Sequence, residues 1–272
     1  MKKLSLFIIF FCLWSGIIMN SQSALANGDI KVLGALTQEK VGNIGESYSD
    51  TILLKNTGQA SCEVKIYQTD YLFRADGSNF YSLPGSNPLS NAKWITLSAS
   101  SVTIPPGQTA PVNYHIKIPQ SEDLHGTYWS LVMVEPVETK SVPSAKGKYT
   151  LGLKTNIRYG VQIVTNIKDT GARRIEILNK KIVDEKGHKF LQFDIINTGE
   201  RWLDPSVSVQ LYNKEGKLLG PFIDPKSRIF PTCSVRHKIF LRDIGKGDYK
   251  AQVIVDNGDQ YVFGANYELT IR

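Results

Sequence analysis

Cysteine is scarce in this chain, with three among 272 residues. Cys12 lies in the apolar N-terminal segment, which leaves only Cys62 and Cys233. A disulfide framework of the kind that holds small secreted domains together is therefore excluded. The two remaining cysteines fall in different predicted domains, so we expect two separate cysteines in half-buried strands and no bridge between domains. The fold must then rely on hydrophobic cores, which a chain of this length can bury.

Long hydrophobic runs are absent after the N-terminus. The one such run, residues 4–19, follows two lysines and precedes the small-residue site Ala24-Leu25-Ala26. This order is typical of a secretory signal peptide, so we expect residues 1–26 to be removed. An uncleaved anchor is the alternative, and the small-residue site argues against it. No other segment approaches the roughly 18 apolar residues of a membrane helix, so we expect no integral membrane segment after cleavage. The predicted location is the periplasm or, alternatively, the extracellular or cell surface.

Motifs that carry chemistry are also missing. The chain has no Gly-x-Ser-x-Gly elbow, no Walker phosphate loop and no His-Glu-x-x-His helix. Its four histidines have no cysteine or carboxylate at ligand spacing, and we expect each to be a surface or loop residue: His115, His125, His188 and His237. We therefore predict no enzyme, no cofactor and no metal site. An envelope hydrolase with an unrecognised site remains a third hypothesis, without a residue constellation to support it.

A concentrated charge of one sign is lacking as well. The formal net charge is +7, and loss of Lys2 and Lys3 with the signal peptide lowers it by two. The basic residues are scattered, and Arg173-Arg174 and Lys180-Lys181 are short pairs without interleaved aromatics. This pattern predicts a solvated surface and no nucleic-acid partner, although it is compatible with anionic envelope polymers.

What the chain does contain is a repeated pattern of strands. Residues 51–58 and 192–199 both end a strand-like run in Asn-Thr-Gly, and Gly-x-Tyr opens a later apolar run at Tyr128 and at Tyr249. The repeated order indicates two related β-domains in tandem. A tyrosine at the start of a late strand fits the tyrosine corner of immunoglobulin-like sandwiches. The predicted fold is all-β, with two tandem immunoglobulin-like β-sandwich domains.

The domain limits follow from strand and turn signals. We expect an N-terminal domain over 27–167, a polar linker over 168–172 and a C-terminal domain over 173–272. Strands are predicted at 50–55, 64–73, 112–118, 128–134, 175–183, 190–196, 207–212, 252–256 and 260–263. Asp184 to Gly187 is expected to close one hairpin, and Asn257-Gly258 a second one through a type I′ turn. No amphipathic helix is predicted, beyond one turn near residues 119–124.

One strand is unusually long. Residues 149–164 alternate, with apolar side chains at all odd positions except Thr155 and polar residues or glycine at most even ones. Sixteen extended residues span about 50 Å, well beyond a common strand. The apolar face can simply complete the core. An exposed edge here could instead add a strand to the sheet of a partner.

Three motifs in residues 100–164 resemble the PapD-like periplasmic pilus chaperones. Residues 101–108 end in Pro105-Pro106-Gly107-Gln108, similar to the turn before that family's fifth strand. Residues 128–136 look like its sixth strand, and residues 153–159 like the last strand of its first domain. The resemblance implies that this last strand lends apolar side chains to a subunit's open groove. It also implies that Arg158 stands where the family has a lysine that binds the subunit's terminal carboxylate.

The chain departs from the family in two places. The arginine of the first strand has no match, since Lys31 and Lys40 are the only basic residues nearby. The Tyr-Arg-Pro end of the last strand is replaced by Tyr159-Gly160-Val161-Gln162. These differences bear on carboxylate binding more than on the fold.

Two hypotheses for function therefore lead. The first is a non-catalytic periplasmic chaperone-like protein that binds a secreted or pilus-type subunit by strand addition along 149–164. Its predicted client-binding residues are Leu151, Leu153, Lys154, Ile157, Arg158 and Tyr159. The second is an adhesion or structural module of the cell envelope. Its contact patch would be the aromatic hairpin of Tyr67, Tyr71, Phe73, Phe80 and Tyr81, which could equally pack as core around the Asp76-Gly77 turn.

Overall fold

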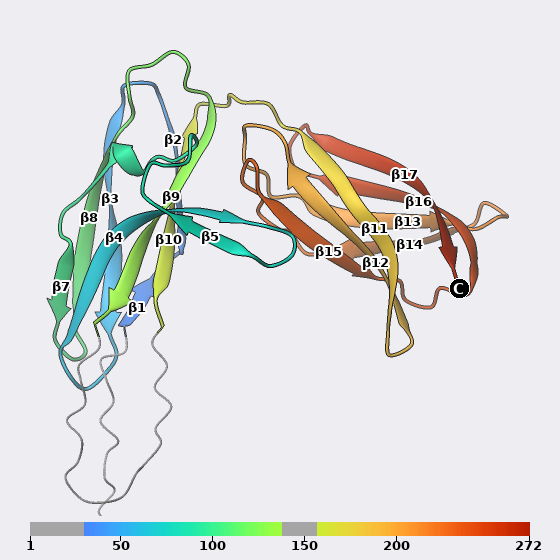
Figure 1. Cartoon of the computed structure of the whole chain (residues 1–272), viewed down its shortest axis with the longest axis horizontal. Coiled ribbons are helices and arrows are strands. Elements are labelled where there is room, and N and C mark those ends of the chain that lie inside the picture. Colours follow the sequence, from blue (N-terminus) through green and yellow to red (C-terminus); the bar gives the residue numbers. More distant parts are fainter. Residues whose placement is uncertain (1–29, 138–156) are drawn as a thin grey trace, which may run out of the picture.

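The computed structural model describes residues 30–137 and 157–272. These residues form strands joined by turns, with one short 3₁₀ helix (Figure 1). The first group of elements is β1 (Ile30–Leu33), β2 (Thr37–Gly42), β3 (Ser47–Asn56), β4 (Cys62–Phe73), β5 (Asn79–Ser82), η1 (Ala92–Trp94), β6 (Ile95–Leu97), β7 (Ser101–Ile104), β8 (Thr109–Lys117), β9 (Gly126–Pro136) and β10 (Tyr159–Ile167). The second group is β11 (Ile175–Glu185), β12 (His188–Asn197), β13 (Ser206–Tyr212), β14 (Leu218–Asp224), β15 (Ser234–Phe240), β16 (Gly247–Asp256) and β17 (Val262–Ile271).

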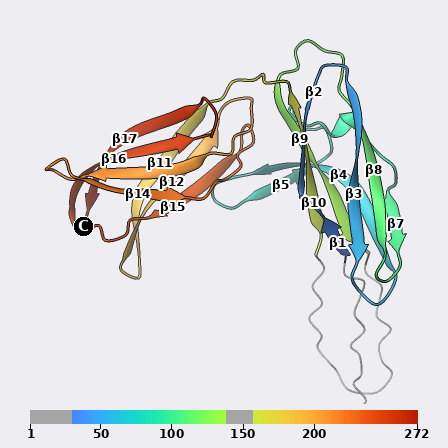
Figure 2. The ribbon, with the colours of Figure 1, turned by 180° about the vertical axis from the view of Figure 1, so that it is seen from behind.

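The first domain is a sandwich of two sheets. One sheet has the order β1-β3-β8-β6, and the other has the order β2-β10-β9-β4-β5, with β7 also paired to β4. Seen from behind, β3 and β8 lie in front of the sheet that contains β9 and β10 (Figure 2). Alternating apolar side chains of both sheets fill the space between them, among them Ile52, Val64, Ile116 and Val132. The sandwich therefore buries one face of each sheet.

The second domain is a seven-stranded sandwich. Its sheets have the orders β11-β12-β15 and β14-β13-β16-β17. The core between them contains Phe193, Ile195, Val209 and Val253. Seven antiparallel strands in two sheets agree with an immunoglobulin-like sandwich. The all-β fold class with tandem sandwiches is thus confirmed.

The Asn-Thr-Gly repeat has the same structural role in both domains. Asn56 ends β3 and Asn197 ends β12, and both side chains are fully buried. Each side-chain amide donates to the carbonyl oxygen four residues later, at 2.7 and 2.8 Å, and to that of Ile104 or Ile229, at 2.8 and 2.9 Å. Each Oδ1 accepts from the glycine N–H two residues later, at 2.9 Å. The two domains are thus related down to individual hydrogen bonds.

The late tyrosines also behave as predicted. Tyr249 Oη donates to the carbonyl oxygen of Gly245 at 3.0 Å, four residues upstream. Burial raises the pKa of Tyr128, while a hydrogen bond from the backbone of His125, three residues upstream, opposes the shift. Each tyrosine therefore ties the start of its strand to the preceding loop.

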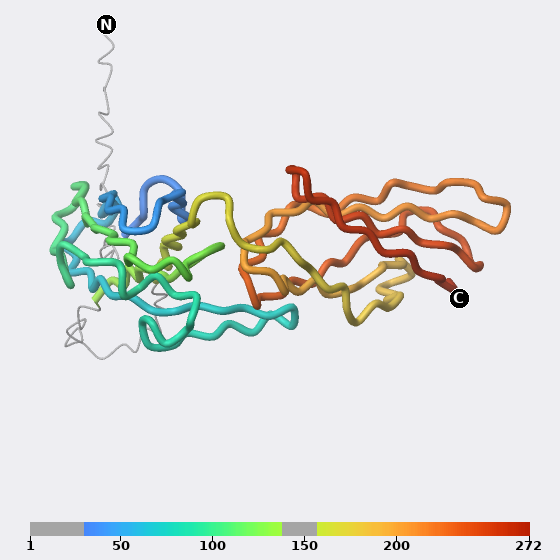
Figure 3. Tube along the Cα trace, turned by 90° about the horizontal axis from the view of Figure 1, so that it is seen from above, coloured from blue at the N-terminus to red at the C-terminus, as the bar shows by residue number. Residues whose placement is uncertain are grey.

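The two domains are joined through side chains as well as through the chain. Trp129 of β9 is 1% exposed and stacks on Phe230, with ring centroids 4.8 Å apart. Phe73 lies edge-on to the same ring at 6.4 Å. The β4–β5 hairpin reaches toward the second domain (Figure 3), where Arg74 donates to the carbonyl oxygen of Thr232 at 2.8 Å. Apolar surface of the first domain thus becomes part of the second domain's core.

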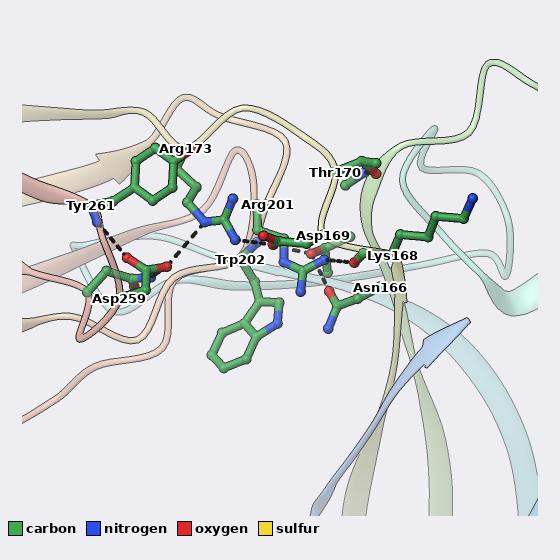
Figure 4. A network of polar contacts seen from close by, with 12 residues as sticks. Asn166, Lys168, Asp169, Thr170, Arg173, Arg201, Trp202, Asp259 and Tyr261 are labelled. Atoms are coloured by element: carbon green, nitrogen blue, oxygen red, sulfur yellow. Dashed lines mark hydrogen bonds and ion pairs between the residues drawn. The ribbon is translucent and has the colours of Figure 1, made fainter. Parts of the chain in front are cut away.

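The segment between β10 and β11 is held in place by charged side chains (Figure 4). Arg173 pairs with Asp169 and with Asp259, the latter at 3.3 Å, and lies over the ring of Tyr261 at 4.6 Å. Arg201 donates to the carbonyl oxygen of Lys168 at 2.8 Å. Side chains from loops of the second domain therefore hold the segment that connects the two domains.

The structure also tests the predictions for one hairpin turn, for the histidines and for the two cysteines. The hairpin of β16 and β17 forms, but the predicted type I′ turn was wrong. The two strands are joined by a longer loop, residues 257–261, in which the N–H of Asn257 donates to the carbonyl oxygen of Tyr261 at 3.2 Å. His237 is not a surface residue, since it is 1% exposed and its Nδ1 lies 2.8 Å from Asp224. Cys62 and Cys233 are both buried, each in the core of a different domain, and are not joined to each other.

No helix in the part of the chain that the structure describes is long and apolar enough to span a membrane.

Candidate functional site

Strand β10 is paired on one side along its whole length and on the other side only in part. It is antiparallel to β9 from Tyr159 to Ile167. Its parallel partner β2 begins only at Gln162, opposite Thr37. Among the described residues, no strand pairs with this side of β10 before Gln162. The first residues of β10 therefore present an open sheet edge.

The open edge arises because the N-terminal segment changes sheets. β1 pairs with β3 in one sheet and β2 pairs with β10 in the other. Gly34 lies between them with a φ of +88°, a conformation that glycine adopts without strain. After this crossing, the N–H of Gln162 donates to the carbonyl oxygen of Leu36 at 2.8 Å. Because backbone groups alternate sides along a strand, those of Arg158 and Gly160 point to the same open side.

One face of the β10-β9-β4-β5 sheet is turned toward the second domain. We call it the cleft face, because Trp129 and Val164 on it belong to the second domain's core cluster. At its far end, the Arg158 guanidinium lies over the Tyr81 ring at 5.7 Å. Beside it, Tyr67 Oη donates to Glu135 Oε2 at 2.6 Å. Strands β4, β5 and β9 thus surround the residue that precedes β10.

The electrostatics at this end centre on Arg158. The hydrogen bond to Glu135 is the main cause that raises the pKa of Tyr67, and the charge of Arg158 acts in the opposite direction. None of the ion pairs among the described residues includes Arg158. Its guanidinium can therefore bind an external carboxylate through two parallel hydrogen bonds.

Next to Arg158, two side chains of β9, Leu131 and Met133, fill the space over Gly160 on the cleft face. A Cβ atom on Gly160 would lie 3.0 Å from Leu131 Cδ1 and 3.4 Å from Met133 Sδ. Both of those side chains are 4% exposed, so there is little space into which they could withdraw. Glycine at this position therefore makes room for these two side chains of β9.

Comparison with known proteins gives structural matches only. No protein-family model and no curated protein sequence matches the chain. The class 5 fimbriae chaperone CfaA matches with 12% identity over 90% of this chain and 100% of its own, at a TM-score of 0.49. The chaperone–tip adhesin complex of CFA/I fimbriae matches with 11% identity over 88% and 98%, at 0.48. The CsuC–CsuE chaperone–subunit pre-assembly complex of Acinetobacter baumannii matches with 13% identity over 89% and 98%, at 0.44.

The chain resembles the PapD-like fimbrial chaperones. This is the same group that the sequence motifs resemble, and at these identities and TM-scores the matches assign no role to any residue. The assignment of the fold is based on the strand pairing within the two sandwiches.

The predicted client-binding residues divide into three groups. Leu151, Leu153 and Lys154 lie outside the described residues. Ile157 and Arg158 are exposed, Ile157 by 54%, and lie at the start of the open edge. Tyr159 is half-buried and packs against the first domain's core. The structure thus brings Ile157 and Arg158 together with the open edge, and turns Tyr159 inward.

Sequence reasoning missed the surroundings of Arg158. Tyr67 and Tyr81 were noted only as members of an aromatic hairpin, and Glu135 and Gly160 were given no role. The glycine within an otherwise continuous strand pattern was the available signal, because a glycine inside a strand often marks close packing over that position. In the part of the chain that is described, no cluster of three His, Cys, Asp or Glu side chains could hold a metal ion.

Proposed function

We propose that the protein is a non-catalytic chaperone-like protein of the periplasm, exported through residues 1–26. It binds a secreted or pilus-type subunit by adding the strand over 149–164 to the subunit's sheet. The observation that carries this proposal is the open edge of β10: among the described residues, no strand pairs with the β2 side of β10 before Gln162. An edge strand with unpaired backbone groups can complete the sheet of a partner.

Each predicted client-binding side chain would have its own role in holding the subunit. Ile157, with Leu151 and Leu153 at alternate positions, offers apolar groups to the subunit, and burial of each contributes about 1.5–3 kcal/mol. Arg158 binds a carboxylate of the subunit, because no described carboxylate pairs with it and its guanidinium presents a planar fork of donors. Lys154 adds positive charge to the same strand, and Tyr159 anchors the strand to the first domain's core.

The test is co-purification from the native host. The chain is tagged at Arg272 and isolated gently from the envelope fraction, and mass spectrometry identifies stoichiometric partners. We expect one small β-rich subunit, lost when Leu151, Leu153 and Ile157 are all changed to serine. The matched control is Val262→Ser, which alters a side chain that is 60% exposed in the second domain.

Two measurements on the triple variant, its thermal unfolding and its retention of the subunit, distinguish lost binding from lost folding. Thermal unfolding monitored by tryptophan fluorescence must be unchanged in the triple variant, so that loss of the partner reports binding and not unfolding. Retention of the subunit by a folded triple variant would exclude strand addition through this segment. Arg158→Gln then tests the carboxylate contact, with an expected weakening of at least tenfold for a desolvated charge pair.

One observation favours the second candidate function, an adhesion or structural module. Phe80 and Tyr81 are 51% and 52% exposed, so this part of the aromatic hairpin is not core. Phe73, in contrast, packs against the second domain. An adhesion or structural module of the cell surface would use the exposed rings. Glycan or matrix binding that is lost on changing Phe80 and Tyr81 to serine, and is insensitive to changes in 149–164, would favour this candidate.

A further inference from the structure

Strand β5 is an edge of the six-stranded sheet and is exposed throughout. Among the described residues it pairs with β4 alone, from Asn79 opposite Phe73 to Ser82 opposite Asp70. All four of its residues are exposed, and the two central ones are aromatic. No charged residue or proline lies within it to discourage pairing with another strand. β5 and β10 lie on opposite sides of β9 and β4, so this edge is separate from the open edge of β10.

The direction of the unpaired backbone groups follows from the hairpin register. The N–H of Arg74 donates to the carbonyl oxygen of Ser78 at 3.0 Å. In an antiparallel ladder the hydrogen-bonded pairs alternate with non-bonded ones. The bonded pairs therefore continue at Leu72–Phe80 and Asp70–Ser82. The N–H and carbonyl groups of Asn79 and Tyr81 point away from β4, to the open edge.

Two arginines flank this edge, one over each central ring. Arg158 lies over Tyr81 at 5.7 Å, and Arg74 lies over Phe80 at 5.8 Å. Neither arginine forms an ion pair with a described carboxylate. The one acidic side chain at the hairpin tip, Asp76, is engaged by Ser78. The surroundings of the edge thus combine exposed aromatic rings with positive charge.

We infer that β5 is a second docking edge, which takes a short extended segment of a protein partner that carries acidic side chains. The outward groups of Asn79 and Tyr81 pair with the backbone of the segment. The acidic side chains of the segment meet Arg74 and Arg158 on the two faces of the strand. The inference goes beyond the proposed function, because it concerns the opposite edge of the sheet and shares only Arg158 with the proposed client site.

The test uses a blocked hexapeptide of alternating glutamate and valine with the isotope-labelled full-length chain. Blocked ends remove the terminal carboxylate, so that binding does not report the contact proposed for Arg158 in the client site. We expect the amide signals of Asn79 and Tyr81 to shift and to gain protection from hydrogen exchange. The same peptide with lysine in place of glutamate is the matched control, and should bind at least about tenfold more weakly, because its charge repels both arginines.

Two variants separate backbone pairing from ring contacts. Tyr81→Pro removes an outward N–H but leaves the ladder bonds of Phe80 and Ser82 intact, and should weaken peptide binding about tenfold. Tyr81→Ala keeps that N–H and should weaken binding by about threefold, through loss of the ring. If Tyr81→Pro does not fold, Asn79→Pro provides the same test at the other outward residue. Ile157→Ser at the β10 edge should leave peptide binding unchanged.

Three outcomes would overturn the inference. The first is equal binding of the glutamate and lysine peptides. The second is peptide-induced shifts confined to residues 157–161 and abolished by Ile157→Ser. The third is self-association that Tyr81→Pro abolishes in sedimentation, with no response to the peptide, since a second copy of the chain would then occupy the edge.

Discussion

At the scale of single residues, equivalent turns in the two domains have different residues at the position with a positive φ. Gly107 and Thr232 each follow a proline and donate to the carbonyl oxygen of the repeated asparagine, Gly107 to Asn56 at 2.9 Å and Thr232 to Asn197 at 2.8 Å. Gly107 has a φ of +72° and Thr232 a φ of +64°. This left-handed region suits glycine and is strained for a β-branched residue. The second domain therefore carries strain that the first domain avoids.

Replacing Thr232 with glycine should stabilise the protein by about 1 kcal/mol, because it removes the strain of a β-branched residue in the left-handed region. The reverse change, Gly107→Thr, should destabilise by a similar amount, since no atom lies within 4 Å of the added Cβ and only the backbone is strained. Denaturant unfolding of both variants measures the effect. Destabilisation by Thr232→Gly would show that the threonine side chain makes a contact worth more than the strain.

The repeated asparagines are a second feature at this scale. Asn197→Ala and Asn56→Ala should each destabilise their domain by about 2–4 kcal/mol, because three hydrogen bonds are lost and buried backbone groups stay unpaired. Asn213 is the matched control: its Oδ1 accepts from the N–H of Lys217 at 2.7 Å in an exposed turn, and Asn213→Ala should cost about 1 kcal/mol or less. Equal effects of Asn197→Ala and Asn213→Ala in urea unfolding would contradict this assignment.

At the scale of elements, neighbouring strands of the second domain are linked by a charged pair. Asp194 of β12 lies opposite Arg236 of β15, and two hydrogen bonds join them at 2.7 and 2.9 Å. The hydrogen bonds from Arg236 are the main cause that lowers the pKa of Asp194, against the opposing effect of burial. The Asp194 side chain is 8% exposed, so solvent screens the pair only in part.

This pair predicts how stability depends on pH. Because the pKa of Asp194 is lower in the folded than in the unfolded chain, its contribution is present above about pH 4 and is lost as the pH falls through the folded pKa. Asp194→Asn should therefore reduce the loss of stability between pH 6 and pH 2, measured by urea unfolding. Asp184 is a control with the same direction of shift, through Lys189, but a half-exposed side chain. An equal or larger effect of Asp184→Asn would argue against the buried pair.

At the scale of the whole molecule, the joint between the domains sets the position of the cleft face. Trp129 extends from the first domain into the second domain's core, and its indole N–H donates to the carbonyl oxygen of Tyr71 at 2.9 Å. Further bonds cross the joint, including that from the N–H of Trp202 to Thr127 Oγ1 at 3.0 Å. Burial of a large aromatic side chain at such a joint couples the stability of the two domains.

Trp129→Ala should uncouple the domains, because it removes the stacked ring that they share. We expect one calorimetric transition for the wild-type chain and two for the variant, with a wider distribution of interdomain distances in solution scattering. Trp94→Ala is the matched control, since Trp94 packs on Tyr128 within the first domain, with ring centroids 4.6 Å apart. A single transition that persists in Trp129→Ala would mean that the polar contacts alone hold the joint.

Several features were predictable from the sequence because they depend on local pattern. Strands with strict alternation, such as β8 and β12, were expected within a few residues of their observed bounds. The repeated Asn-Thr-Gly and Gly-x-Tyr patterns predicted two related domains, since a side chain that bonds its own turn acts over a few residues. Short strands with little alternation were missed, among them β1, β2 and β5 of four to six residues, and so were the seven-residue strands β14 and β15.

Tertiary structure decided the rest, because sheet pairing joins residues that are far apart in the sequence. The alternation of residues 159–164 predicted a strand whose odd positions face a core, with Arg158 at its start. Only the path of β2, which meets β10 at Gln162, showed that no other described strand pairs with this side of β10 before that residue. Likewise, only the β4–β5 hairpin brings Tyr81 beneath Arg158. An edge is defined by the absence of a neighbour, and a neighbour is a property of the folded sheet.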